Sequence, residues 1–143
     1  MRFRKQENLY VVRFEEGEVF PSRFIDFLES RSIFNGSFIA IGAFSRLRIA
    51  YFDVEISRYA DLDVDEQVEV LSLAGNVARH SEQPLVHAHI IVGRRDYSTL
   101  GGHLREGSVR PTLELFLSVS AQPLQREVEP KYGLPALQLN EKF

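Results

Sequence analysis

Three histidines are the residues of this sequence best suited to chemistry. His87 and His89 flank one residue inside an apolar segment, and His103 follows a pair of adjacent glycines. Residues i and i+2 of a β-strand project from the same face, so the first two imidazoles would lie side by side. Paired glycines let the backbone pass close to another group, so a loop could bring the third imidazole to them.

Three neutral imidazoles are the ligand set of a catalytic-type zinc site, with a fourth position left open for water or another molecule. Imidazole also suits other late transition metals. The sequence therefore predicts a metal site at His87, His89 and His103, with Zn²⁺ as the leading ion. In the competing interpretation, the first two histidines hydrogen-bond to neighbours and the third is a solvated loop residue. Spacing alone leaves both open, because His-x-His also arises by chance. His80, outside the triplet, is expected in an exposed turn.

Glu114 is the carboxylate most able to assist such a site. It lies opposite an apolar face of its predicted strand, and it could accept a hydrogen bond from a metal-bound imidazole or act as a general acid or base. The simpler interpretation is a solvent-facing glutamate behind a core face. Glu69 poses the same question with less support.

The elements that must position these residues are one helix and many strands. Phe24, Phe27 and Leu28 recur at helical spacing after Pro21, which predicts an amphipathic helix that closes at the Asn35–Gly36 pair. Strands are predicted over 9–14, 37–44, 46–53, 67–73, 85–92 and 112–120, with 54–59 extended, loops at 61–66 and 93–107, and a turn at 76–79. Both faces of 85–92 are apolar apart from its histidines, so this strand is expected inside the sheet.

One helix followed by closely spaced strands indicates an α+β fold: a large, mostly antiparallel sheet with the amphipathic helix packed on it. The length of 143 residues fits a single domain over 1–143, in which the proline-containing segment 122–143 is expected to form an extended C-terminal tail.

The composition excludes several classes of function. Without cysteine there is no disulfide and no thiolate ligand. No apolar run approaches the roughly 20 residues needed to cross a bilayer, and the charged N-terminus has no apolar leader, so we expect a cytoplasmic protein without a membrane partner. A net charge of −3 with scattered arginines is weak support for DNA binding.

Four blocks of the sequence resemble the plant-and-prokaryote-conserved (PPC) domain family, in its stand-alone prokaryotic type. They are VEVLSLAG at 68–75, PLVHAH at 84–89, GGHLREGSV at 101–109 and TLE at 112–114, and the resemblance extends over nearly the whole chain. It implies an α+β domain assembled as a homotrimer, with a metal, usually taken as zinc, held by His87, His89 and His103. Prokaryotic members are often described as predicted DNA-binding proteins.

The resemblance leaves three functions open. The first is a trimeric, metal-containing regulatory or DNA-associated protein, although this chain lacks the Arg-Gly-Arg-Pro stretch of the AT-hook that accompanies the domain in plants. The alternative is a zinc-dependent lyase acting on a small carbonyl or hydroxy acid, since the fold also resembles acetolactate decarboxylase, with Glu114 as proton carrier. The third is a metal-stabilised interaction domain without chemistry. The first two leave room for a small-molecule ligand at the metal.

Overall fold

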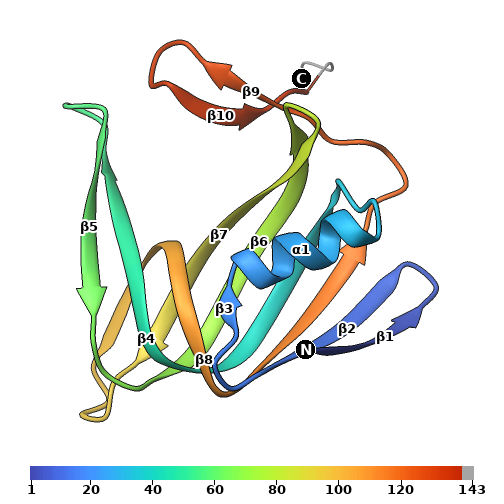
Figure 1. Ribbon diagram of the computed structural model, residues 1–143. Coiled ribbons are helices and arrows are strands. Elements are labelled where there is room, and N and C mark those ends of the chain that lie inside the picture. Colours follow the sequence, from blue (N-terminus) through green and yellow to red (C-terminus); the bar gives the residue numbers. More distant parts are fainter. Residues whose placement is uncertain (140–143) are drawn as a thin grey trace.

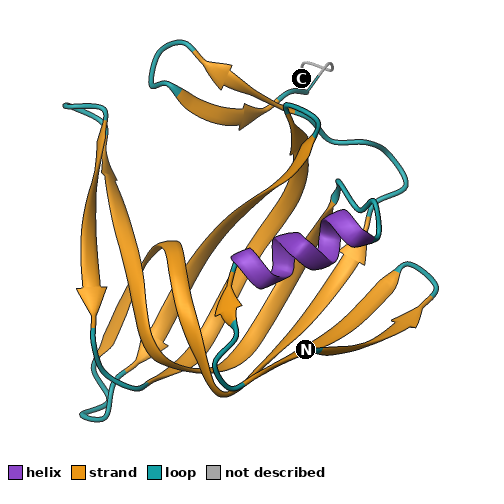
Figure 2. Ribbon diagram, in the orientation of Figure 1, coloured by secondary structure: helices purple, strands orange, loops and turns teal. Residues whose placement is uncertain are grey.

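Most of this chain forms β-strands because apolar and polar side chains alternate over long stretches. The computed structural model describes residues 1–139, in which a single helix and a mostly antiparallel sheet form one α+β domain, as predicted (Figures 1 and 2). The elements are β1 (Arg2–Gln6), β2 (Leu9–Glu15), β3 (Val19–Phe20), α1 (Ser22–Ser30), β4 (Gly36–Asp53), β5 (Arg58–Val64), β6 (Val68–His80), β7 (Gln83–Gly93), β8 (Thr99–Val119), β9 (Arg126–Glu129) and β10 (Leu134–Leu137).

The main sheet curls until it meets itself. Its strand order is β1-β2-β8-β7-β6-β4-β5, and β8 also pairs with β4, so β4, β6, β7 and β8 form a closed cycle of paired strands. Both long strands bend where their shared register shifts, between Gly42 and Arg46 on β4. Gly42 has φ +151°, and a Cβ there would collide with the carbonyl oxygen of Thr112, so the bend requires glycine.

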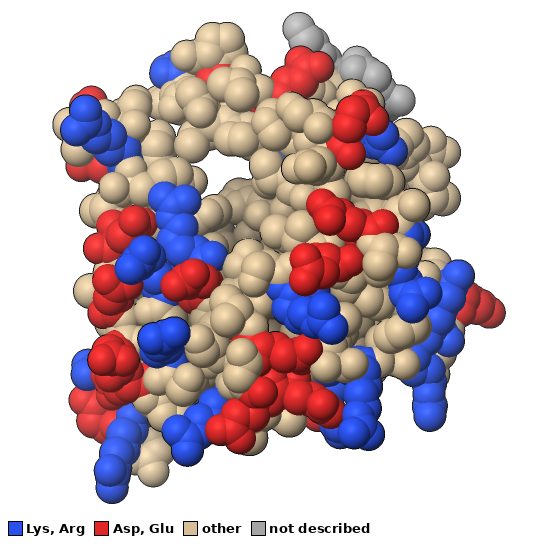
Figure 3. All heavy atoms as spheres, viewed as in Figure 1, with Lys and Arg blue, Asp and Glu red and all other residues tan. Residues whose placement is uncertain are grey.

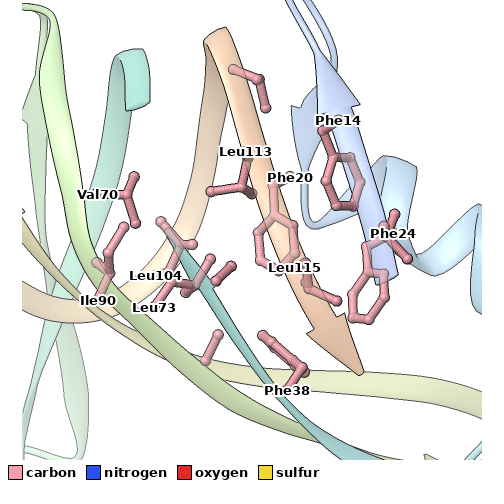
Figure 4. Close-up of a cluster of buried hydrophobic side chains, with 14 of the residues drawn as sticks. Phe14, Phe20, Phe24, Phe38, Val70, Leu73, Ile90, Leu104, Leu113 and Leu115 are labelled. Carbon is pink, nitrogen blue, oxygen red and sulfur yellow. The ribbon is translucent and has the colours of Figure 1, made fainter. Parts of the chain in front are cut away.

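Phenylalanine rings fill the space between helix α1 and the sheet. Phe24 of α1 lies 5.2 Å from Phe38 of β4 and 5.6 Å from Phe20, measured between ring centroids. Phe14 packs edge-on against the same group (Figure 4). These four side chains are almost fully buried. This apolar core anchors one face of the sheet and leaves the opposite face available for a site.

The helix begins as predicted and ends earlier than predicted. It stops at Ser30, and Ser32 adopts φ +53°, a left-handed conformation that breaks the helical run. The expected end at Asn35–Gly36 was therefore wrong. Gly36 already belongs to β4, where it pairs with Val77 and Val119.

Several segments expected as loops or turns are strands. The acidic segment 61–66 lies largely in β5, where Asp63 forms an ion pair with Arg48 of β4 at 2.6 Å. The expected turn at 76–79 is a continuation of β6, and most of the expected loop at 93–107 is the first half of β8. The predicted strands 37–44 and 46–53 are one strand, β4. These segments form strands because they pair with neighbouring strands, and local composition does not reveal such pairing.

β1 was not predicted. Within the C-terminal segment, β9 and β10 form an antiparallel hairpin, which joins the end of β6 through a bridge between Arg79 and Gln125. Over residues 1–139, no helix has both the length and the apolar character required to span a membrane.

Candidate metal centre

The fold brings the three predicted histidines together. His87 and His89 project from β7, and His103 of β8 is the direct cross-strand partner of His89. Their ring centroids are separated by 5.1–5.5 Å, and one ring nitrogen from each lies within 4.8 Å of the other two. A tetrahedral ion bound at about 2.0–2.1 Å needs nitrogens about 3.3 Å apart, so small rotations of the rings would complete the set.

Strand register, not a loop, positions His103. Gly101 and Gly102 belong to β8, and a Cβ added at Gly102 would lie 2.9 Å from the carbonyl oxygen of Ala50. The glycines therefore allow close backbone approach, as the sequence suggested, but between paired strands. The expectation of a return loop was wrong.

The histidine face of β7 is open, whereas the opposite face is buried. Ala88, Ile90 and Val92 point into the core. On the other face, His87 is half-buried, His89 is exposed and Ile91 is 50% exposed. The expectation that this strand lies inside the sheet is confirmed, because β7 pairs with β6 on one side and β8 on the other.

A buried arginine from the C-terminal hairpin contacts the cluster. Arg126 of β9 is only 7% exposed, and its Nη2 lies 3.3 Å from Nδ1 of His87. The same nitrogen donates to Oδ1 of Asn76 at 2.7 Å, and Nη1 donates to the carbonyl oxygen of Pro135 at 2.7 Å. Sequence reasoning missed Arg126 because no periodic pattern marks the C-terminal segment.

Two of the imidazoles are held neutral by their surroundings. Burial lowers the pKa of His87, and the charge of Arg126 and the neighbouring His89 lower it further. Burial also lowers the pKa of His103 to about 4, with His87 and Arg105 adding to the effect. A neutral ring keeps a lone pair for a metal, so these nitrogens are available as ligands at neutral pH.

The cluster fits a borderline divalent metal ion. Nδ1 of His103 is buried and has no hydrogen-bond partner among the described residues, and a metal bound to the cluster would account for a ring nitrogen that these residues leave unsatisfied. Three imidazole nitrogens are a donor set typical of Zn²⁺ and other late transition metals. The ring of Tyr59 packs over His103 at 5.2 Å, and Arg105 stacks on Tyr59, so the far side of His103 is shielded from solvent.

The other predicted site residues lie elsewhere in the chain. Glu114 is exposed further along β8, opposite Arg13 and Ile41, and it does not join the histidine group. Glu69 is exposed on β6 and does not join the group either. His80 ends β6, where its Nδ1 lies 2.9 Å from the carbonyl oxygen of Arg126.

Two features together define the class of protein. One is a curled sheet that is closed by the pairing of β4 with β8, and the other is a cluster of three histidines on its uncovered face. The chain belongs to the family of the Plants and Prokaryotes Conserved (PCC) domain, whose model matches residues 1–120. Arg126 lies beyond the matched range.

Solved structures support the same assignment. A presumed DNA-binding protein from Bacteroides thetaiotaomicron is 29% identical, with a TM-score of 0.94 and 98% of each chain covered. A metal-containing protein from Archaeoglobus fulgidus is 28% identical, with a TM-score of 0.85, covering 96% of this chain and 97% of the other. A plant- and prokaryote-conserved (PPC) protein from Pyrococcus horikoshii is 28% identical, with a TM-score of 0.87, covering 99% and 97%. No curated protein matches the chain.

Proposed function

We propose that this protein is a metal-binding regulatory domain, and that His87, His89 and His103 hold the metal, with Zn²⁺ as the leading ion. The observation that carries the proposal is the convergence of three ring nitrogens from β7 and β8 to within 4.8 Å. The unsatisfied Nδ1 of His103 and the similarity to the metal-containing protein of Archaeoglobus fulgidus add support.

A bound Zn²⁺ supplies Lewis acidity and an open fourth position. This chain's own residues determine how that position is used. His89 is exposed, so the position opens on the uncovered face of β7. No carboxylate of the described residues joins the three histidines as an acid or base. That arrangement favours ligand sensing or structural stabilisation over the lyase chemistry considered as the alternative.

The uncovered face also supports assembly into the proposed homotrimer. Apolar side chains form a strip across four strands beside His89; they are Phe116 of β8, Ile39 and Ile41 of β4, Leu71 of β6 and Ile91 of β7. Ile39 lies directly opposite Phe116 in the β4–β8 register. A contiguous exposed patch of this kind is typical of a protein–protein interface. We call it the apolar strip.

DNA association is the second proposed role. Its support is the similarity to the presumed DNA-binding protein of Bacteroides thetaiotaomicron. The net charge of −3 argues against strong contact with phosphates, and Figure 3 shows acidic and basic side chains intermixed on the face in view. We therefore expect any effect on DNA to depend on a partner or a ligand.

Metal analysis of purified protein tests the central proposal. We expect about one equivalent of a transition metal per chain in the wild type, and a loss of most of it in His89→Ala and in His103→Ala, because two imidazoles bind far more weakly than three. His80→Ala is the matched control and should keep its metal, since His80 lies outside the cluster. Equal metal content in all four proteins would refute the assignment.

A further inference from the structure

Arg126 is a buried cation that no acidic group within residues 1–139 neutralises. It is the only charged residue within 1–139 that is buried, and none of the ion pairs among these residues includes it. Its three hydrogen-bonding partners, Asn76, Pro135 and His87, are all neutral groups. A buried charge without a counter-charge is costly, so this arrangement calls for a reason.

The hydrogen bonds of Arg126 are also incomplete. Its Nε is buried without a partner among the described residues. Nε and Nη2 share one edge of the guanidinium, which is the edge that grips a carboxylate or phosphate with two parallel N–H···O bonds. In this structure, Nη2 is directed at Asn76 and His87.

Metal binding would release one of these contacts. A guanidinium can only donate, so the contact of Nη2 with His87 requires a free lone pair on Nδ1. If the metal binds Nδ1, it takes that lone pair. If the metal binds Nε2, the neutral ring carries its proton on Nδ1, and two donors face each other. In either case Arg126 loses an acceptor when the cluster is loaded.

The loaded cluster would hold an excess of positive charge. A divalent ion with three neutral imidazoles keeps its full charge, and the guanidinium lies 3.3 Å from one of these rings. The acidic group that acts on His103 is Asp61, which is already paired with Arg105 at 3.2 Å. The positive charge of the metal ion and of Arg126 is therefore not compensated, and it would attract an anion.

We propose that the metal cluster and Arg126 together bind a small oxyanion, such as a carboxylate or phosphate group. This inference rests on the proposed metal site and adds the class of ligand. The C-terminal hairpin contributes Arg126 from β9. The ring of its Tyr132 packs against the ring of Phe52 of β4, with the two ring centroids 6.5 Å apart. Figure 3 shows the molecule hollowed between this hairpin and the tip of β4 and β5. A shallow groove of about 360 Å³, lined by Ala74, Gly75, Asn76, His87 and His89, lies against two of the three histidines. Arg126 adjoins this groove through its contacts with Asn76 and His87.

Calorimetric titration of zinc-loaded protein at low ionic strength tests the inference. The probes are sodium acetate, inorganic phosphate and acetamide, a neutral counterpart of acetate. We expect acetate or phosphate to bind the wild type about tenfold or more tightly than Arg126→Gln, because a charge-assisted hydrogen bond is lost. Lys131→Gln is the matched control: it removes a positive charge from the exposed turn of the same hairpin and should bind like the wild type. Acetamide should not bind.

The outcomes separate this inference from the metal site itself. Whichever of acetate and phosphate binds more tightly identifies the oxyanion. Equal binding by wild type and Arg126→Gln, or no binding of either anion by protein that carries zinc, overturns the inference and leaves the metal site intact. Absence of zinc from the wild type, measured on the same samples, overturns the proposed function instead. If Arg126→Gln does not fold, Arg126→Lys replaces it: the planar fork is lost, so affinity should fall several-fold, and unchanged affinity would be decisive against the role.

Discussion

The residue types alone pointed to a candidate metal site. His87 and His89 share a face because strand periodicity is two, and that rule needs no tertiary information. The partnership of His103 with His89 depends on β7–β8 register, which the glycine pair only suggested. Arg126 gave no signal, because its contact with His87 joins segments that are far apart in the sequence.

The depressed pKa of His103 predicts how the metal-free protein responds to acid. Its folded pKa is about 4, below its ordinary value of 6.5. Between these two pH values, the His103 imidazole is protonated in the unfolded chain and neutral in the folded chain. The free energy of unfolding should therefore be greatest above pH 6.5 and should fall as the pH drops toward 4. Urea denaturation of metal-free protein at several pH values measures this.

His103→Gln provides the comparison for that measurement. The variant should lose less stability between neutral pH and pH 4 than the wild type, with the remaining loss due partly to His87, whose pKa is also lowered. Identical pH profiles for the two proteins would show that His103 is not the group responsible.

At the scale of elements, the alternation of apolar residues predicted the central strands. It failed for segments that become strands only because they pair with a neighbouring strand. The strands 67–73 and 85–92 were found because their sequences are rich in β-branched and apolar residues. The acidic stretch of β5 has a loop-like composition, yet Asp61 and Asp63 point outward to Arg105 and Arg48 while the backbone pairs with β4. Such a strand is specified by its neighbours.

The bends of β4 and β8 were equally hidden. The sequence predicted two short strands, 37–44 and 46–53, whereas β4 continues through Ser45 with shifts of register. The curl places the first half of β8 beside β7, and this brings His103 to His89. The site therefore depends on a curvature that the sequence marks only through glycine, at Gly42 on β4.

At the scale of the whole molecule, the apolar strip predicts the assembly. Ile39 belongs to this strip and is 65% exposed, so Ile39→Glu should place a charge in the interface and dissociate the proposed trimer. Light scattering coupled to size-exclusion chromatography should give about three times the 16.4 kDa chain mass for the wild type and a smaller mass for the variant. Val54→Glu, at a site that is also exposed but lies outside the strip, should remain trimeric. A wild type that elutes as a monomer would contradict the assembly.

X-ray absorption spectroscopy at the edge of the bound metal identifies the atoms that coordinate the ion. We expect a first coordination sphere with three imidazole nitrogens at about 2.0–2.1 Å and one further light atom, and fewer imidazole nitrogens around any metal that His103→Ala retains. An oxygen-only sphere, or an unchanged spectrum in His103→Ala, would show that the metal binds somewhere other than the meeting point of β7 and β8.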